Sequence, residues 1–200
     1  MKSVMLSIQP KWCEKIASGK KTIEVRKTAP KEVPFKAYIY ETKKEHLRVV
    51  FKKGDYIFSD DHNAGKFDEN IFVKDRYSWQ GKVVGEFICD KVYNLVNAFG
   101  GIMFADENLN QLEPQLFRDM SCLTDEQTAD YLGNKDGYGL HITALKIYDK
   151  PKELNEFERP CSYKGTCYCC VRAKFESDGT LLCDNKMTRP PQSWQYVEDL

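Results

Sequence analysis

The sequence predicts an α+β domain with a mostly antiparallel sheet that curls toward a barrel and is flanked by a few helices. Two observations lead to this class. Segments with the period or composition of a strand outnumber helical segments, of which only three or four are present. The connections between them are unequal in length and show no internal repeat. Two hundred residues are enough for one domain with a real hydrophobic core.

The chain opens with a predicted strand, helix, turn and strand. Partial alternation predicts a strand over 3–8. Pro10 suits the first turn of a helix, and helical spacing of apolar residues continues to Ser18. Gly19 then ends the helix, as glycine commonly does just past a helix C-terminus. A strand is expected directly afterwards, over 22–26.

The rest of the chain follows the same reading. Strands are predicted over 35–41, 46–51, 56–58, 82–92 and 138–148. A short helix is expected from Glu113-Pro114 to Met120. A second begins after Thr124, with Gln127 completing a capping box, and ends at Gly133. The stretch 97–113 is polar and glycine-containing, so it is expected to be a long connection of undefined structure.

Charge is unevenly distributed along a chain whose formal net charge is zero. Residues 1–54 hold 14 Lys/Arg and five Asp/Glu, a net of +9, whereas the remainder holds 16 and 25, a net of −9. This distribution favours two readings equally. The basic part either forms a patch for phosphates, with the acidic part turned away, or packs beside an acidic face.

The sequence also indicates the cellular compartment of the protein. It contains no apolar run of membrane-spanning length, and its N-terminus is interrupted by Pro10 too early for a signal peptide. We therefore expect a cytoplasmic protein with no membrane partner. In that compartment the eight cysteines are thiols or metal ligands rather than disulfides.

The stretch 18–26 contains the polar and charged residues that are the main candidates for a functional site. Ile23 and Val25 alternate with a hydroxyl, a carboxylate and a guanidinium on the other strand face. Two readings are open for that polar face. It is an ordinary exposed face with a Glu–Arg pair of little energetic consequence, or it lines a ligand-binding cleft. The polar set consists of Thr22, Glu24 and Arg26, with Lys20 and Lys21 at the mouth.

These residues resemble a known family. Leu6-Ser7-Ile8-Gln9-Pro10, a helix, and then Gly19, Lys21, Glu24 and Arg26 in a Gly-x-Lys-x-x-Glu-x-Arg string resemble the opening of ASCH (activating-signal-cointegrator homology) domains. The later Lys53-Gly54-Asp55 and Val84-Gly85-Glu86 also resemble this family, so the resemblance covers roughly 3–150. The tail over 189–198, with its Pro-Pro-Gln-Ser-Trp string, resembles a subgroup of bacterial and phage ASCH proteins.

The resemblance implies a PUA-like β-barrel over 1–155 with a cleft beside the first helix, and a cysteine-rich tail over 156–200 that packs on the barrel. RNA binding is the usual inference for this superfamily. Some small ASCH proteins are amidohydrolases that remove the acyl group from N4-acylated cytidine, with a catalytic lysine at the position of Lys21. Glu24 stands where those enzymes have a threonine.

Candidate ligand-binding residues follow from the chemistry of this cleft. Arg26 suits a phosphate or carboxylate, Glu24 suits an exocyclic amine, and a desolvated Lys21 would have a lowered pKa and act as a base or nucleophile. Nucleobase recognition also needs an aromatic platform. Trp12 is expected in the core instead, because it lies on the apolar helix face. The complete predicted set is Lys20, Lys21, Thr22, Glu24, Arg26, Trp79, His141 and Trp194.

The tail predicts a metal site. Five of the eight cysteines lie within 23 residues, and Cys167 and Cys170 form a Cys-x2-Cys pair. With Cys161 and Cys183 they supply four thiolates, enough for one structural zinc in a segment too short to form its own core. Reduced thiols in a loop are the alternative. Cys13, Cys89 and Cys122 are predicted to be small core residues.

Three functions are therefore open. The first is binding of RNA or a nucleotide through the cleft of the Gly-x-Lys-x-x-Glu-x-Arg motif. The second is a small amidohydrolase acting on a modified nucleoside such as N4-acetylcytidine, with Lys21 and Glu24 as catalytic residues. The third and weakest is a protein-interaction module, such as a phage-like regulator, that uses the acidic second half as its binding face.

Overall fold

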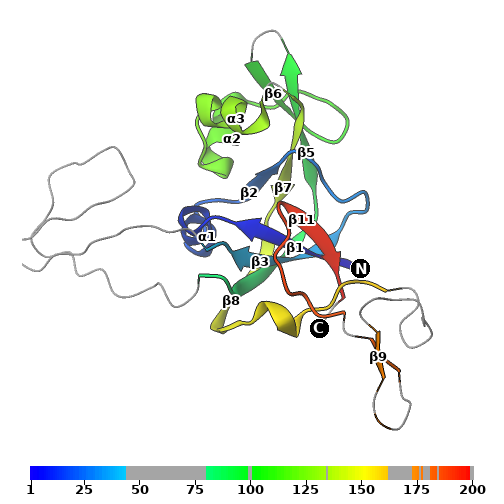
Figure 1. Cartoon of the computed structure of the whole chain (residues 1–200). Coiled ribbons are helices and arrows are strands. Elements are labelled where there is room, and N and C mark those ends of the chain that lie inside the picture. Colours follow the sequence, from blue (N-terminus) through cyan, green and yellow to red (C-terminus); the bar gives the residue numbers. More distant parts are fainter. Residues whose placement is uncertain are drawn as a thin grey trace, which may run out of the picture.

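In the residues that the structure describes, a five-stranded sheet, a four-stranded sheet and three short α-helices form the main body of the fold, and two further short strands pair with each other (Figure 1). The computed structural model describes residues 1–43, 80–98, 101–133, 135–161, 173–175, 177, 181–183 and 185–198. The strands predicted over 46–51 and 56–58 lie outside these residues.

The first sheet has five strands in the order β11-β1-β3-β4-β8. Its members are β1 (Lys2–Ile8), β3 (Phe35–Glu41), β4 (Val83–Cys89), β8 (Thr143–Lys152) and β11 (Trp194–Val197). All of its neighbouring pairs are antiparallel except β1 and β3, which run parallel. That pair requires a crossover, which the first helix and β2 provide.

The second sheet has four strands in the order β2-β7-β5-β6, all antiparallel. Its members are β2 (Ile23–Arg26), β5 (Val92–Ala98), β6 (Gly101–Ala105) and β7 (Gly137–His141). The short strands β9 (Ala173–Phe175) and β10 (Leu181–Cys183) pair only with each other. The α+β class is thus confirmed.

A closed barrel is not confirmed, because the strands divide between sheets. The predicted strand over 138–148 is two strands, β7 and β8, which belong to different sheets and meet at Ile142. The backbone N–H of Ile142 donates to the carbonyl of Thr22, at the start of β2. The predicted strand over 82–92 corresponds to β4, which ends at Cys89; its last residue, Val92, begins β5 in the other sheet, and the rest of β5 was not predicted. Local alternation does not reveal such transfers, because both halves retain strand composition.

The helices follow their predicted signals. Helix α1 (Pro10–Ala17) begins at Pro10, and Gly19 has a φ of 72°, the left-handed conformation expected at a helix C-terminus. Helix α2 (Pro114–Ser121) and helix α3 (Asp125–Leu132) come next, and Thr124 and Gln127 form the predicted capping box. A short 3-10 helix, η2 (Leu154–Glu156), follows β8. Within the predicted connection over 97–113, the structure adds strand β6, paired to β5.

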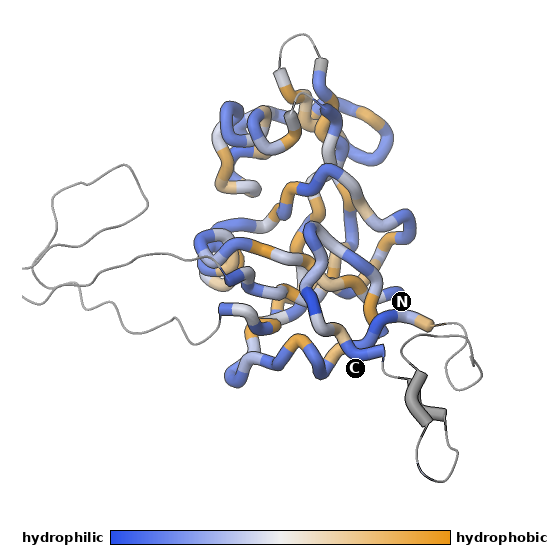
Figure 2. The backbone as a smooth tube through the Cα atoms, in the orientation of Figure 1, coloured by the Kyte–Doolittle hydropathy of each residue, from blue (hydrophilic) through white to orange (hydrophobic). Residues whose placement is uncertain are grey.

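Three apolar clusters hold these elements together, and Figure 2 shows hydrophobic segments along the central strands. One lies between α1 and the five-stranded sheet and includes Leu6 and Ile16. A second covers the opposite face of that sheet and includes Tyr38 and Phe157. The third joins the four-stranded sheet to α2 and α3, where Phe104 contacts Phe117. Burial on both faces makes the five-stranded sheet the centre of the domain.

Residues beyond 156 contribute to this core. Phe157, Met187 and Val197 are at most 4% exposed and belong to the same cluster as Met5 and Tyr38. Strand β11 also pairs with β1 along the edge of the sheet. The described parts of the tail are therefore structural components of the domain.

Candidate functional site

Strand β2 carries a buried ionic cluster rather than a solvated polar face. Its four residues are all buried, and Glu24 and Arg26 are only 3% and 6% exposed. The Glu24 carboxylate lies 2.5 Å from Arg26 Nη1 and 3.4 Å from Lys21 Nζ. The reading of an ordinary exposed strand face is therefore wrong. Packing of β2 against β7, α2 and the end of β1 removes the polar side chains from water.

Lys21 reaches its buried position across the turn between α1 and β2. Its side chain is 2% exposed, and its ammonium donates to the carbonyl of Ser121, the last residue of α2, at 2.8 Å. The ammonium also lies 5.2 Å from the centre of the Trp12 ring. Burial lowers the pKa of Lys21, and this effect exceeds the opposing attraction of Glu24.

Arg26 links the two sheets. Its Nη2 donates to the carbonyl of Ser7 in β1 at 2.8 Å, and its Nη1 donates to the carbonyl of Val25 at 3.1 Å. Within the described residues, Arg26 Nε and Glu24 Oε2 are buried without a hydrogen-bond partner. The guanidinium of Arg26 is engaged in contacts inside the protein. It could bind a ligand phosphate only if these contacts were broken. The cluster as a whole places two cations around one carboxylate.

The accessible charge lies above this cluster, on α1. Lys11 Nζ and Lys15 Nζ lie 4.7 Å and 5.0 Å from the centre of the half-buried Trp12 ring. Lys20 is exposed, and its backbone N–H donates to the carbonyl of Lys15. We call Lys11, Trp12, Lys15 and Lys20 the α1 surface. Thr22, also half-buried, follows it, with its backbone N–H bound to the carbonyl of Met120.

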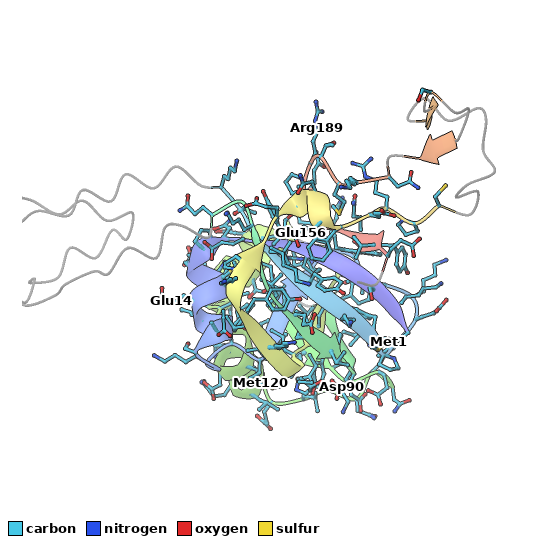
Figure 3. The ribbon with its side chains drawn as sticks, turned by 90° about the horizontal axis from the view of Figure 1, so that it is seen from below. Met1, Glu14, Asp90, Met120, Glu156 and Arg189 are labelled. Atoms are coloured by element: carbon cyan, nitrogen blue, oxygen red, sulfur yellow. The ribbon has the colours of Figure 1, made fainter. Side chains whose placement is uncertain are left out.

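The other predicted site residues do not join this group. His141 Nδ1 lies 2.7 Å from Asp90 Oδ1, and Figure 3 shows Asp90 well separated from Glu14 of α1. Trp194 Nε1 donates to the carbonyl and the hydroxyl of Thr28 at 3.1 and 3.0 Å. These bonds give Trp194 a structural role on the β11 edge. Trp79 lies outside the described residues.

The predicted zinc site stays a prediction. Cys161 is a free, half-buried thiol, whereas Cys167 and Cys170 lie outside the described residues. Cys183 falls in β10, whose backbone alone is described. Across the described residues, no group of three potential ligands comes together. Of the predicted core cysteines, Cys13 and Cys89 are buried, but Cys122 is half-buried at the end of α2, where its Sγ lies 3.2 Å from the Lys20 carbonyl oxygen.

Sequence reasoning placed Trp12 in the core and missed its lysine neighbours. The ring does pack against the core cluster of α1, yet it remains half-buried, with cations around it. Lys11 is adjacent to Trp12 in sequence and Lys15 is three residues further on. That spacing places Lys15 beside the ring on a helix, so a search for lysines next to aromatic residues would have found the pair.

Comparison with known proteins supports the fold. ASCH from Zymomonas mobilis matches 98% of this chain and 88% of its own, at 16% identity and a TM-score of 0.51. A mutant of that protein matches 99% of this chain and 91% of its own, at 15% identity and a TM-score of 0.50. At such identity the likeness concerns the fold alone.

The remaining comparisons concern the sequence. No curated protein matches it. In the parts that the structure describes, no helix is long and apolar enough to cross a membrane. The model of the family described as ASCH domain matches residues 6–98, which include the Gly19 to Arg26 string and the whole of the α1 surface. Residues 6–98 of the chain are therefore similar to ASCH domains.

Proposed function

We propose that this chain binds RNA through the α1 surface. ASCH domains as a family are associated with RNA binding, and the carrying observation is the Trp12 ring flanked by Lys11 and Lys15. Single-stranded RNA is bound by a positive groove that follows its phosphates and by aromatic rings on which its bases stack. The α1 surface offers both groups within one short helix and the turn after it.

The lysines of the α1 surface suit phosphates because they are free to move. Lys11 and Lys20 are exposed and Lys15 is half-buried, and each ends a long flexible side chain. A base that stacks on the open part of Trp12 would displace the lysine ammonium groups from the ring toward the flanking phosphates. Each phosphate neutralised releases counterions, so binding should weaken steeply as salt rises.

The buried cluster has a supporting role in this proposal. Lys21 lies beneath the Trp12 ring, and Arg26 and Glu24 hold β2 against β1 and α2. The three side chains together carry one excess positive charge when Lys21 is protonated. Placed under the α1 surface in a low-dielectric interior, that charge adds to the attraction for phosphate. The motif therefore positions the binding surface instead of contacting RNA directly.

Charge-matched variants test the proposal. Changing Lys11, Lys15 and Lys20 together to Gln should weaken binding to a pool of single-stranded RNAs about 10-fold or more at moderate salt. Affinity should also depend less steeply on salt: the magnitude of the negative slope of log affinity against log salt should fall by about one for each phosphate that is no longer neutralised. Fluorescence anisotropy across a salt series measures both quantities.

The matched control removes three exposed lysines elsewhere, Lys135, Lys146 and Lys150. The net charge changes equally in both triple variants, so only a local site distinguishes them. Equal losses of affinity in the two variants would show that net charge alone attracts RNA. Absence of binding to the whole pool at low salt would remove the proposed function.

One observation favours the amidohydrolase as a second function. The lowered pKa of Lys21 increases the fraction of neutral amine, the form that acts as a base or nucleophile. The 2% exposure of the side chain and its bond to Ser121 stand against it, because a substrate must reach the amine. For this function, release of acetate from N4-acetylcytidine is expected, and Lys21→Met should abolish it. A folded, pure protein that leaves acylated cytidines intact would exclude it.

A further inference from the structure

A second potential binding site lies on the face of the five-stranded sheet opposite α1. It is a pocket of about 660 Å³ between the end of β3, η2 and the segment 187–192. Figure 3 labels Glu156 of η2 and Arg189 of that segment, and both lie away from Met120 of α2. Its volume falls within the range of about 300–1,000 Å³ typical of small-molecule sites.

The walls of this pocket are fixed by hydrogen bonds. Ser7 donates its hydroxyl to the carbonyl of Pro191 at 2.6 Å and its backbone N–H to the carbonyl of Ser193 at 3.0 Å. The backbone N–H of Met187 donates to the carbonyl of Phe157, next to η2, at 2.8 Å. These bonds tie the C-terminal segment to β1 on one side and to η2 on the other. The wall formed by the C-terminal segment is therefore held in place before a ligand binds.

Tyr40 presents an unpartnered hydroxyl to the pocket. Its side chain is 4% exposed and belongs to the apolar cluster on this face of the sheet. Among the described residues, no donor or acceptor is paired with the hydroxyl, although Tyr40 lines the pocket. The hydroxyl is not among the atoms that are buried without a partner, so it is open to solvent and a bound group can pair with it in place of water. Burial also raises the pKa of Tyr40, so the hydroxyl is a neutral donor at physiological pH.

A lysine lies at the rim of the same pocket. Lys43 is exposed and lines the pocket, and its aliphatic stem lies over Gly81, where a Cβ atom would clash with it. No ion pair engages Lys43 within the described residues. The one carboxylate that lines the pocket, Glu153, is already bound to Lys82 at 2.7 Å. The ammonium of Lys43 is therefore available to an anionic group of a ligand.

The remaining residues that line the pocket limit the class of ligand that it can bind. Leu154, which is half-buried, and Pro190, which is exposed, offer apolar surface to a flat ring. Asn155 and Gln192 are exposed at the rim and supply amide donors and acceptors of the kind that pair with a heterocycle edge. One available cation suits one phosphate, whereas a polyphosphate would need more. A wholly apolar ligand would leave Tyr40 and the amides unpaired.

We propose that this pocket binds a single nucleotide, with its phosphate at Lys43, its ribose or base hydrogen-bonded to Tyr40, and its ring between Leu154 and the segment 187–192. The choice of a nucleotide rests in part on the proposed RNA-binding function. The nucleotide is either free in solution or an unstacked nucleotide of a bound RNA. In both cases the pocket recognises the same chemical unit, one nucleoside monophosphate.

Titration calorimetry with the full chain tests this proposal. The probes are the four ribonucleoside 5′-monophosphates, the four nucleosides and inorganic phosphate. At least one monophosphate should bind. Tyr40→Phe, which keeps the ring and removes the hydroxyl, should weaken that binding about fivefold or more. Lys43→Gln should weaken binding of the monophosphate and leave binding of the matching nucleoside unchanged.

Tyr148→Phe is the matched control. Tyr148 is also buried in the cluster on this face, but its hydroxyl already donates to Glu86 at 2.6 Å and it does not line the pocket. This variant should therefore retain full affinity for the monophosphate. Thermal unfolding of each variant checks that the fold is retained. If none of the four monophosphates binds at millimolar concentration, or if Tyr40→Phe and Lys43→Gln bind as tightly as the original chain, the proposal is overturned.

The same titrations separate this proposal from the proposed function. The chain with Lys11, Lys15 and Lys20 changed to Gln should keep its affinity for the monophosphate while it loses affinity for RNA. RNA binding without monophosphate binding would remove the pocket proposal alone. Monophosphate binding without RNA binding would support the pocket and remove the RNA function. Competition between monophosphate and RNA would identify RNA as the source of the nucleotide.

Discussion

Replacing Glu24 by Gln is expected to lower the free energy of unfolding by about 3–5 kcal/mol, the usual cost of removing one partner from a buried ion pair. Glu24 is 3% exposed and lies between Arg26 and Lys21. The amide keeps the size of the side chain but removes its charge. Two buried cations are then left without a counter-charge. Denaturant unfolding monitored by circular dichroism measures the change.

Two further variants make this prediction specific. Glu107→Gln, at an exposed position, should change stability by less than about 0.5 kcal/mol. The double variant Glu24→Gln with Lys21→Met should be more stable than Glu24→Gln alone, because one of the two uncompensated cations is gone. A loss below about 1 kcal/mol for Glu24→Gln would show that water reaches the cluster, contrary to the structure.

The pH dependence of the Glu24→Gln variant has a definite sign. Burial lowers the pKa of Lys21 below its ordinary value of 10.5, and loss of Glu24 removes the attraction that opposes this shift. Between the lowered pKa and 10.5 the unfolded chain binds more protons than the folded chain. Stability therefore rises with pH across that window. The difference between Glu24→Gln and the double variant should accordingly shrink as the pH approaches 10.5.

Replacing Phe157 by Ala is expected to cost about 3–5 kcal/mol, because it removes a fully buried ring from the core. Phe157 packs edge-to-face on Tyr38 of β3, with ring centres 4.8 Å apart, and its carbonyl accepts a hydrogen bond from Met187. The substitution leaves a cavity between the five-stranded sheet and the residues that follow β8. Chemical denaturation measures this loss as a lower midpoint concentration of denaturant, while the dependence of the free energy of unfolding on denaturant (the m-value) stays unchanged.

Leu116→Ala is the control for Phe157→Ala. Leu116 is 45% exposed on α2, so its truncation removes a large apolar side chain without opening a core cavity. Its cost should stay well below that of Phe157→Ala. If the two substitutions cost the same, the residues beyond 156 would be an appendage and not part of the domain core.

Local signals in the sequence predicted the helices and most of the strands. Pro10 and Gly19 bound α1, and Thr124 with Gln127 caps α3, because each signal acts within one turn of backbone. The division of the 138–148 strand at Ile142 was missed. That bend depends on a hydrogen bond to Thr22, which is remote in sequence. The two sheets likewise depend on pairings that no local window contains.

The candidate site was likewise predicted only in part from the sequence. Alternation in β2 correctly grouped Glu24 with Arg26, but it did not reveal that both are buried. Arg26 donates to the backbone carbonyl of Ser7, and Lys21, the other cation beside Glu24, donates to the backbone carbonyl of Ser121; both carbonyls lie in other elements. Carbonyl groups are present in every residue, so the sequence carries no signal for them. The pocket at Tyr40 was missed because its opposite wall is formed by the segment 187–192.

Amide chemical shifts of the isotopically labelled full chain, titrated with a short single-stranded RNA at low salt, test the proposed RNA interface most directly. We predict that the largest shifts occur over 10–22, which contains the α1 surface and the turn to β2. Those shifts should reverse when salt is added, because phosphate contacts depend on counterion release. Saturable shifts confined to β8 or α3, with α1 unchanged, would contradict the assignment of RNA binding to the α1 surface.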